Sequence, residues 1–142
     1  MTENYIRYKS GYKYQLVEEY HVQTNICPPE DVMEKDGFIL LTKEGMLTIK
    51  QWYAWDGPSG PTRDTPDFMR GSLVHDAFYQ LLRQDKLDQS MRDKADSELK
   101  RMCVEDGMNK WKATMVLFAV RKWGKMAADP ASRKQPISAP PR

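Results

Sequence analysis

The sequence predicts an α+β domain in which an N-terminal antiparallel β-hairpin region is followed by three α-helices. Residues 12–55 contain runs in which apolar and polar side chains alternate, a period typical of strands. Residues 65–126 repeat their apolar side chains every three to four positions, as helices do. We expect a single domain over 1–126, made of a β region (1–55), a loop (56–64) and three helices (65–126), followed by a flexible tail rich in Pro and Ser (127–142).

The composition is that of a soluble globular domain and excludes several classes of protein. The chain has 142 residues, of which 40% are hydrophobic and 30% charged. No apolar run approaches the roughly 20 residues that span a bilayer, and residues 1–14 hold no apolar segment, so we expect no signal peptide. Cys27 and Cys103 form no C-x-x-C pair, which excludes a disulfide scaffold and a thiolate zinc site. A net charge of +2 is too small to argue for nucleic acid as a partner, so nucleic-acid binding through the basic last helix is the weakest of the possible functions.

The β region carries two strand signals. Residues 12–22 place aromatic and aliphatic side chains on one parity, which predicts a first strand. The apolar run 38–42, the short connection 43–45 and the alternating segment 46–55 together predict a hairpin. Gly45 supplies the positive φ that such a tight connection needs.

A loop rich in Gly and Pro, residues 56–62, leads into the first helix. Its glycines let backbone atoms approach a ligand closely and its prolines stiffen it, although taken alone the loop is typical of a rigid turn. Thr65-Pro66-Asp67 then marks a helix start, with an N-cap hydroxyl, proline at the first position and an acid in the first turn. This helix should continue to about Gln84.

Two further helices are predicted after a polar turn. The second should cover 91–105, and the third 110–123, between the cap Asn109 and the stop Gly124. The third helix is basic, which we interpret as a solvated face, with phosphate or membrane contact as the alternative. The inward positions of the second helix are Ala95, Leu99, Met102 and Cys103, and one stripe of the third helix carries Trp111, Met115, Phe118, Ala119 and Lys122.

His75, Tyr79 and Asp96 are candidate catalytic residues because the first two helices should bring them together. His75 and Tyr79 share one face of the first helix. In an antiparallel pair, His75 lies about 11 to 12 residues before the turn and Asp96 about 8 to 9 after it, so at ~1.5 Å per residue their heights differ by about one helical turn. A buried carboxylate there would accept one ring N–H of His75, and the other ring nitrogen could take a proton from water.

Asp76 is the candidate metal ligand. It points about 100° away from His75 around the helix, toward the Gly/Pro loop. Loop carbonyls and the carboxylates of Asp56 and Asp64 could add further oxygen ligands, which calcium prefers, and the metal would polarise a carbonyl or phosphoryl group. The alternative is a helical pair whose polar residues contact each other for stability alone. The combination of loop, His-Asp pair and distant aspartate favours the site.

The segment His75-Asp76-Ala77-Phe78-Tyr79, followed by Ala95-Asp96-Ser97, resembles the phospholipase A-two superfamily and especially its short prokaryotic branch. The likeness covers about residues 53–124. It implies a lipid ester hydrolase in which His75 is the general base, Asp76 the calcium ligand, and Tyr79 and Asp96 the supporting network. It also implies that backbone carbonyls near Trp55, Gly57 and Ser59 complete the metal shell.

The whole chain is similar to a family of short proteins, without an assigned activity, that tailed phages and prophages encode. The shared pattern is a Trp-Asp-Gly-Pro-Ser-Gly loop, then Leu-Val-His-Asp and a later Ala-Asp. We therefore predict a phage-encoded, calcium-assisted hydrolase of phospholipid that meets a membrane surface. The alternative is a non-catalytic virion component or host-interaction module that binds phage structural proteins. Either function would place the protein in the host cytoplasm or the virion.

Overall fold

The computed structural model describes residues 3–9, 14–57, 65–132, 138 and 140 of the chain. Over these ranges an antiparallel β region precedes three α-helices, which confirms the predicted α+β class. The strands are β1 (Tyr8–Lys9), β2 (Tyr14–Leu16), β3 (Tyr20–Gln23), β4 (Val32–Met33), β5 (Ile39–Leu41), β6 (Met46–Ile49) and β7 (Ala54–Trp55). The helices are α1 (Pro66–Arg83), α2 (Arg92–Glu105) and α3 (Lys110–Ala128), with short 3₁₀ helices η1 (Gln89–Met91) and η2 (Pro130–Ser132). Within the described part of the chain, no helix combines the length and the apolar character that crossing a membrane requires.

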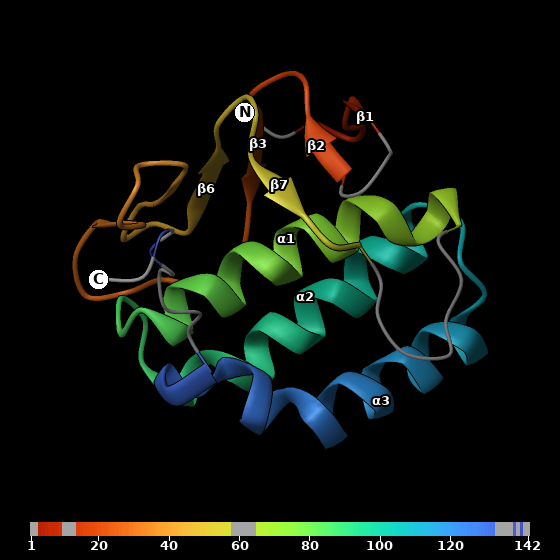
Figure 1. The fold of residues 1–142 in the computed structure, drawn as a ribbon. Coiled ribbons are helices and arrows are strands. Elements are labelled where there is room, and N and C mark those ends of the chain that lie inside the picture. The colour runs from red at the N-terminus through yellow and green to blue at the C-terminus, as the bar shows by residue number, and fades with distance from the viewer. Residues whose placement is uncertain (1–2, 10–13, 58–64, 133–137, 139, 141–142) are drawn as a thin grey trace.

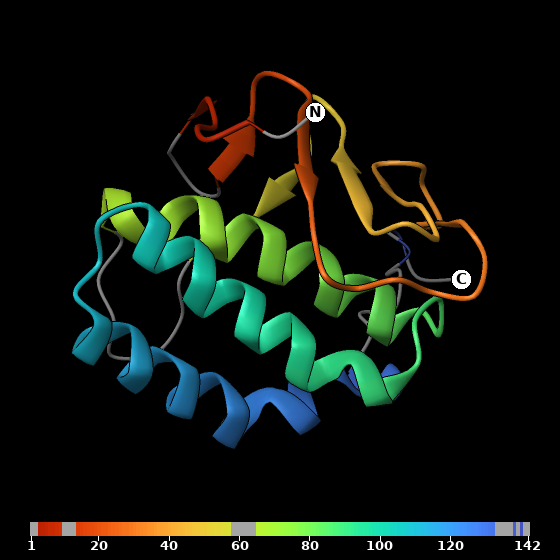
Figure 2. The same cartoon turned by 180° about the vertical axis from the view of Figure 1, so that it is seen from behind.

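The elements are stacked with α1 and α2 in the middle of the molecule (Figure 1). The strands lie on one side of this helical pair and α3 lies on the other, and the view from behind shows the same order (Figure 2). α1 contacts both α2 and α3, and α2 contacts α3. One face of α1 can therefore belong to the main core while another faces α2 and α3.

Two small antiparallel sheets take the place of the long strands predicted from the sequence. Their strand orders are β1-β2-β7 and β3-β6-β5-β4. The prediction of one strand over 12–22 was wrong, because the chain breaks between β2 and β3, and its first two positions lie outside the described residues. The prediction of one return strand over 46–55 was also wrong, because the chain breaks between β6 and β7.

Both breaks lie at the same place in the fold. The backbone N–H of Leu16 donates to the carbonyl of Tyr53 (2.8 Å), and the N–H of Trp52 donates to the carbonyl of Leu16 (2.7 Å). Trp52 adopts a φ of +77°, which turns the chain sharply. The two neighbouring segments thus bend together and pass from one sheet into the other. The buried positions keep the same parity on both sides of the bend, although Glu18 and Gln51 within it are exposed. Because the parity is unchanged, the sequence pattern does not divide the strands there.

The predicted tight connection before β6 is present. Gly45 has a φ of +90°, and its N–H donates to the carbonyl of Thr42 at 2.9 Å. A Cβ atom at this position would lie 2.5 Å from the carbonyl oxygen of Thr24. Only glycine therefore fits both the backbone angle and the space, as the turn chemistry predicts.

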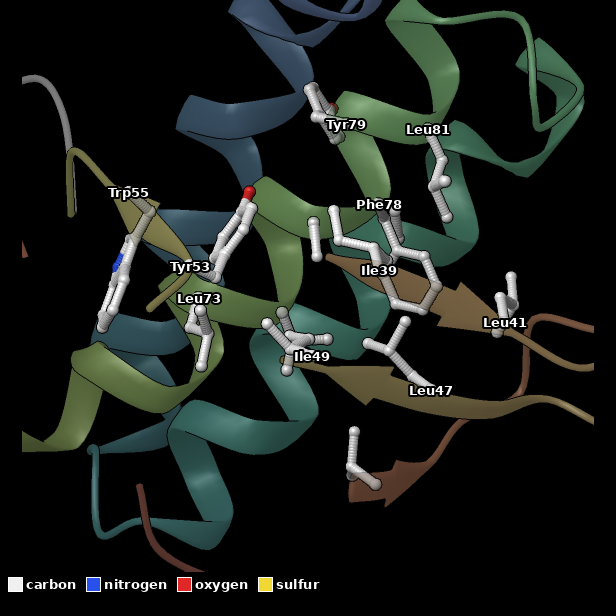
Figure 3. Packing of buried hydrophobic residues seen from close by; sticks show 14 of the residues in the cluster. Ile39, Leu41, Leu47, Ile49, Tyr53, Trp55, Leu73, Phe78, Tyr79 and Leu81 are labelled. Atoms are coloured by element: carbon white, nitrogen blue, oxygen red, sulfur yellow. The ribbon is translucent and has the colours of Figure 1, made fainter. Parts of the chain in front are cut away.

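The main core joins the larger sheet to α1 (Figure 3). The strands contribute Ile39, Leu41, Leu47 and Ile49, which pack with Leu73, Phe78 and Leu81 of α1, and all of these side chains are at most 1% exposed. Each such burial contributes about 1.5–3 kcal/mol. His75 lies about 200° around the helix from Leu73. The core contact therefore orients α1 so that His75 faces away from the sheet.

The first two helices begin close to their predicted starts. α1 starts directly after Thr65, although the Thr65 hydroxyl donates to the carboxylate of Asp67 and caps no backbone N–H. α2 starts one residue later than predicted. Its predicted inward residues, Ala95, Leu99, Met102 and Cys103, are all buried. A Cβ at Gly71 would lie 2.9 Å from a methyl of Leu99, so this glycine allows α1 and α2 to approach closely.

The third helix is longer than predicted. Asn109 caps it as expected, since its side-chain oxygen accepts the N–H of Trp111 at 2.8 Å. The prediction that Gly124 ends the helix was wrong, because α3 continues to Ala128. Gly124 is buried, and a Cβ there would overlap the hydroxyl of Tyr79 on α1. This glycine therefore serves helix packing.

Candidate active site

His75, Asp96 and Tyr79 form one hydrogen-bonded group. Nε2 of His75 and the hydroxyl oxygen of Tyr79 each lie 2.7 Å from Oδ1 of Asp96. The rings of His75 and Tyr79 are neighbours, with centroids 4.2 Å apart and planes tilted by 34°. α1 supplies His75 and Tyr79 one turn apart, and α2 supplies Asp96. The predicted meeting of the two helices at this height is confirmed.

The carboxylate of Asp96 is fully buried. Burial, followed by the hydrogen bond to Asp96, raises the pKa of Tyr79, so its hydroxyl keeps its proton and donates it to Asp96. The second oxygen of Asp96, Oδ2, has no hydrogen-bond partner among the described residues. A buried carboxylate with so few donors stabilises a positive charge on the ring of His75.

A cavity of about 390 Å³ opens beside this group. Its polar lining consists of Ser72, His75, Asp76, Tyr79 and Arg83. The remaining lining is largely apolar and includes Phe68, Leu99, Ala119, Val120, Trp123 and Ala127. Since Nε2 of His75 is bound to Asp96, Nδ1 is the ring nitrogen left for a group in the cavity. The cavity thus combines an apolar space with one oriented imidazole, as sites for small molecules often do.

Asp76 lies on the same cavity wall and is partly buried. Its carboxylate accepts the backbone N–H of Asp56, so the loop end predicted to meet Asp76 does so. Burial raises the pKa of Asp76 to about 6; the nearby His75 and Arg83 lower the pKa, and the like charge of Asp56 raises it. A cation beside Asp76 would offset both the burial and the repulsion. These oxygen donors therefore fit a hard cation such as calcium.

Only some of the other predicted metal ligands lie within the described residues. Gly57 lines the cavity with a φ of +81°, and a Cβ there would overlap the ring of Tyr14. The indole of Trp55 donates to the hydroxyl of Ser72 at 3.0 Å, which fixes the loop end against α1. Ser59 and Asp64 lie outside the described residues.

Ligation by the carbonyls of Trp55 and Gly57 stays a prediction. Over the described ranges, no group of three or more His, Cys, Asp and Glu side chains could hold a metal ion. A metal shell around Asp76 would therefore need backbone carbonyls, which are ligands that calcium accepts.

The sequence does not predict two parts of the site. Arg83 lies seven residues after Asp76, two turns along the same face, so helical spacing could have found it. Its guanidinium donates to the carbonyl of Ala127 at 3.1 Å and lines the cavity. The sequence holds no such signal for the part of the cavity wall that Trp123 forms. That wall depends on the close approach of α3 to α1, which Gly124 allows.

Comparison with known proteins identifies no relative of this chain. It matches no protein-family model, and no curated protein or solved structure is significantly similar to it. The grounds for a functional assignment are therefore the fold and the site.

Substituting Asp76 by Asn is expected to stabilise the metal-free protein at neutral pH. Because the folded state raises the pKa of Asp76 from 3.8 to about 6, ionisation of this group destabilises the fold as pH rises through that window. At about 1.4 kcal/mol per pKa unit, the gain at pH 7.5 is at most about 3 kcal/mol, and it should vanish below about pH 4. Urea unfolding with a chelator present, at both pH values, measures the difference. The exposed Asp36→Asn is the control, and an Asp76→Asn protein less stable than wild type at pH 7.5 would contradict the prediction.

Proposed function

We propose that the protein is a calcium-assisted ester hydrolase that acts on phospholipid, with water as the nucleophile. The observation that supports this most strongly is the pair of 2.7 Å contacts that orient His75 at the wall of a largely apolar cavity. An apolar space beside a general base suits an ester with a long acyl chain. The resemblance of the His-Asp-x-x-Tyr segment to the phospholipase A-two superfamily adds to this reading, although likeness alone does not transfer function.

His75 would take one proton from water and later give it to the leaving group. Asp96 accepts the N–H at Nε2 of His75, so the neutral ring carries its lone pair on Nδ1. Nδ1 removes a proton from water while the water oxygen attacks the ester carbonyl carbon, and the carbonyl oxygen becomes an oxyanion. The imidazolium, stabilised by Asp96, then returns the proton to the departing alkoxide as the C–O bond breaks. The products are a fatty acid and the deacylated lipid.

Asp76 and the loop end beside it would hold the calcium ion. The carboxylate of Asp76 and the carbonyls of Trp55 and Gly57 are the ligands we propose, with Asp56 and Ser59 as further donors. A calcium ion bound there supplies a Lewis acid that polarises the ester carbonyl and stabilises the oxyanion. Arg83 would attract the phosphate of the lipid, since this residue lines the same cavity.

A second candidate function is a non-catalytic virion component or host-interaction module of a phage. The observation that favours it is the set of exposed aromatic and Met side chains on α3, since exposed apolar side chains that lie together mark interaction sites. Detection of the protein at fixed stoichiometry in purified virions, with His75 replaceable without loss of infection, would support this function over hydrolysis. Either function is compatible with a host-cytoplasmic or virion location.

Fatty-acid release from phospholipid vesicles by the purified protein tests the proposed hydrolase. We expect release that needs millimolar calcium, stops when a chelator is added and falls sharply in Asp76→Asn, since that variant loses the charged ligand. Replacing calcium by magnesium should restore little activity, because magnesium demands a smaller, octahedral shell. Activity that is equal with calcium and with chelator would overturn the calcium role, and its absence under all conditions would overturn the hydrolase.

A further inference from the structure

One face of α3 exposes large apolar side chains. Trp111, Met115, Phe118, Trp123 and Met126 are each at least 60% exposed. Four of them, Trp111, Met115, Phe118 and Met126, recur at three- to four-residue spacing with Lys122 among them, and we call this set the α3 face. Figures 1 and 2 show α3 at the edge of the molecule, on the far side of the helical pair from the strands. The α3 face is therefore directed outward.

The charge on α3 is of one sign. Residues 110–128 contain Lys110, Lys112, Arg121, Lys122 and Lys125 and no acidic residue. Apolar and aromatic side chains interleaved with lysines are typical of helices that lie in the plane of a membrane, where the lysines reach the headgroups and the apolar groups enter the acyl region. Anionic lipid attracts each such lysine or arginine with about 1 kcal/mol near the surface.

The side of α3 that lines the cavity adjoins the α3 face, since Trp123 lies about 100° around the helix from Lys122. Trp123 is exposed on the outside of α3 and also lines the cavity, together with Ala119 and Ala127 of the same helix. A surface that carries the α3 face would thus lie beside the cavity opening. A lipid leaving that surface would meet the apolar wall before it reached His75.

We propose that the α3 face binds an anionic lipid surface in the membrane plane and holds the cavity opening against it. This proposal names the partner of the proposed hydrolase site and therefore rests on the proposed function. The contact between the α3 face and the lipid surface itself needs no catalysis. A second copy of the chain fits the α3 face less well. Lys122 lies in the middle of the face, and two such helices would oppose five positive charges to five without an acid between them.

Cosedimentation with vesicles tests the proposal without any turnover. The protein carries His75→Gln, so no lipid is consumed, and the vesicles are either neutral phosphatidylcholine or the same lipid with about a third phosphatidylglycerol. We expect binding to the anionic vesicles that weakens as salt is raised. Met115→Gln with Phe118→Gln should lower the partition coefficient at least tenfold, since two apolar side chains no longer enter the acyl region. Lys122→Gln with Lys125→Gln should lower it by about 30-fold on anionic vesicles only, which corresponds to about 1 kcal/mol for each lysine.

Two controls separate this contact from other effects. Met33→Gln removes a Met of similar exposure (55%, against 60% for Met115) from β4, on the strand side of the molecule, and should leave the partition coefficient unchanged. Light scattering without lipid shows whether the protein is monomeric. A dimer that Met115→Gln with Phe118→Gln converts to monomer would overturn the proposal in favour of a second copy. Absence of vesicle binding would also overturn it, yet would leave the hydrolase intact if the protein still cleaves dispersed short-chain lipids.

Discussion

Substituting His75 by Gln is expected to lower calcium-dependent fatty-acid release by at least about 10³-fold, because the variant has no base to take the proton from water. The Gln side chain can still donate to Asp96, so the fold should persist. Initial rates on phospholipid vesicles, compared as kcat/KM, measure the loss. His21→Gln is the matched control. His21 lies on β3, where its ring contacts Thr48 and Glu19. The substitution should therefore leave the rate unchanged.

Substituting Asp96 tests whether His75 and Asp96 act together. Asp96→Asn should lower the rate by about 10²- to 10⁴-fold, because an amide no longer fixes the tautomer of His75 or stabilises its imidazolium. The double variant His75→Gln with Asp96→Asn should be no slower than His75→Gln alone, since the two residues act as one unit. Losses that multiply in the double variant would show that the two residues act independently and would contradict the proposed roles.

The meeting of His75 and Asp96 could be predicted from the sequence because it depends on local regularities. The rise per residue and the length of the turn fix the relative height of two antiparallel helices, and the 3.6-residue period fixes which face each residue occupies. The apolar positions of α1 and α2 carry the same periods. For this reason the buried side of both helices could be predicted from the spacing of apolar residues. The turn at Gly45 could be predicted because a tight connection needs a residue that adopts a positive φ.

The remainder depends on contacts that no local pattern encodes. The kink that divides the predicted strands arises where Leu16 bonds to Trp52 and Tyr53, more than thirty residues away. A glycine is typical of a helix end, yet Gly124 lies inside α3. It is there because the absence of a side chain leaves room for the hydroxyl of the distant Tyr79. The apolar stripe of α3 is typical of a buried face, and only the position of α3 at the edge of the molecule leaves it exposed. In each case tertiary packing overrides a local signal.

Substituting Arg70 by Met is expected to lower the free energy of unfolding by about 3 kcal/mol, the lower end of the cost of breaking a buried ion pair. The guanidinium of Arg70 is 3% exposed. It donates to the Tyr20 hydroxyl of β3 at 3.0 Å, to Asp106 at 3.0 Å and to Glu105 at 2.9 Å. One side chain on α1 therefore links the sheet to the end of α2. Glu105 can turn to water without Arg70, but the mostly buried Asp106 would keep an unpaired charge.

Urea unfolding of wild type, three single variants and one double variant isolates this contribution. Arg7→Met breaks an exposed ion pair with Glu18 and should cost less than about 0.5 kcal/mol, which makes it the matched control. Asp106→Asn removes the charge that Arg70 neutralises. If that charge causes the loss, Arg70→Met should cost at least about 1 kcal/mol less in the Asp106→Asn background than in wild type. An equal cost in both backgrounds would assign the effect to the volume of the Arg70 side chain between the sheet and the helices, and the link between α1 and α2 would then be a packing contact.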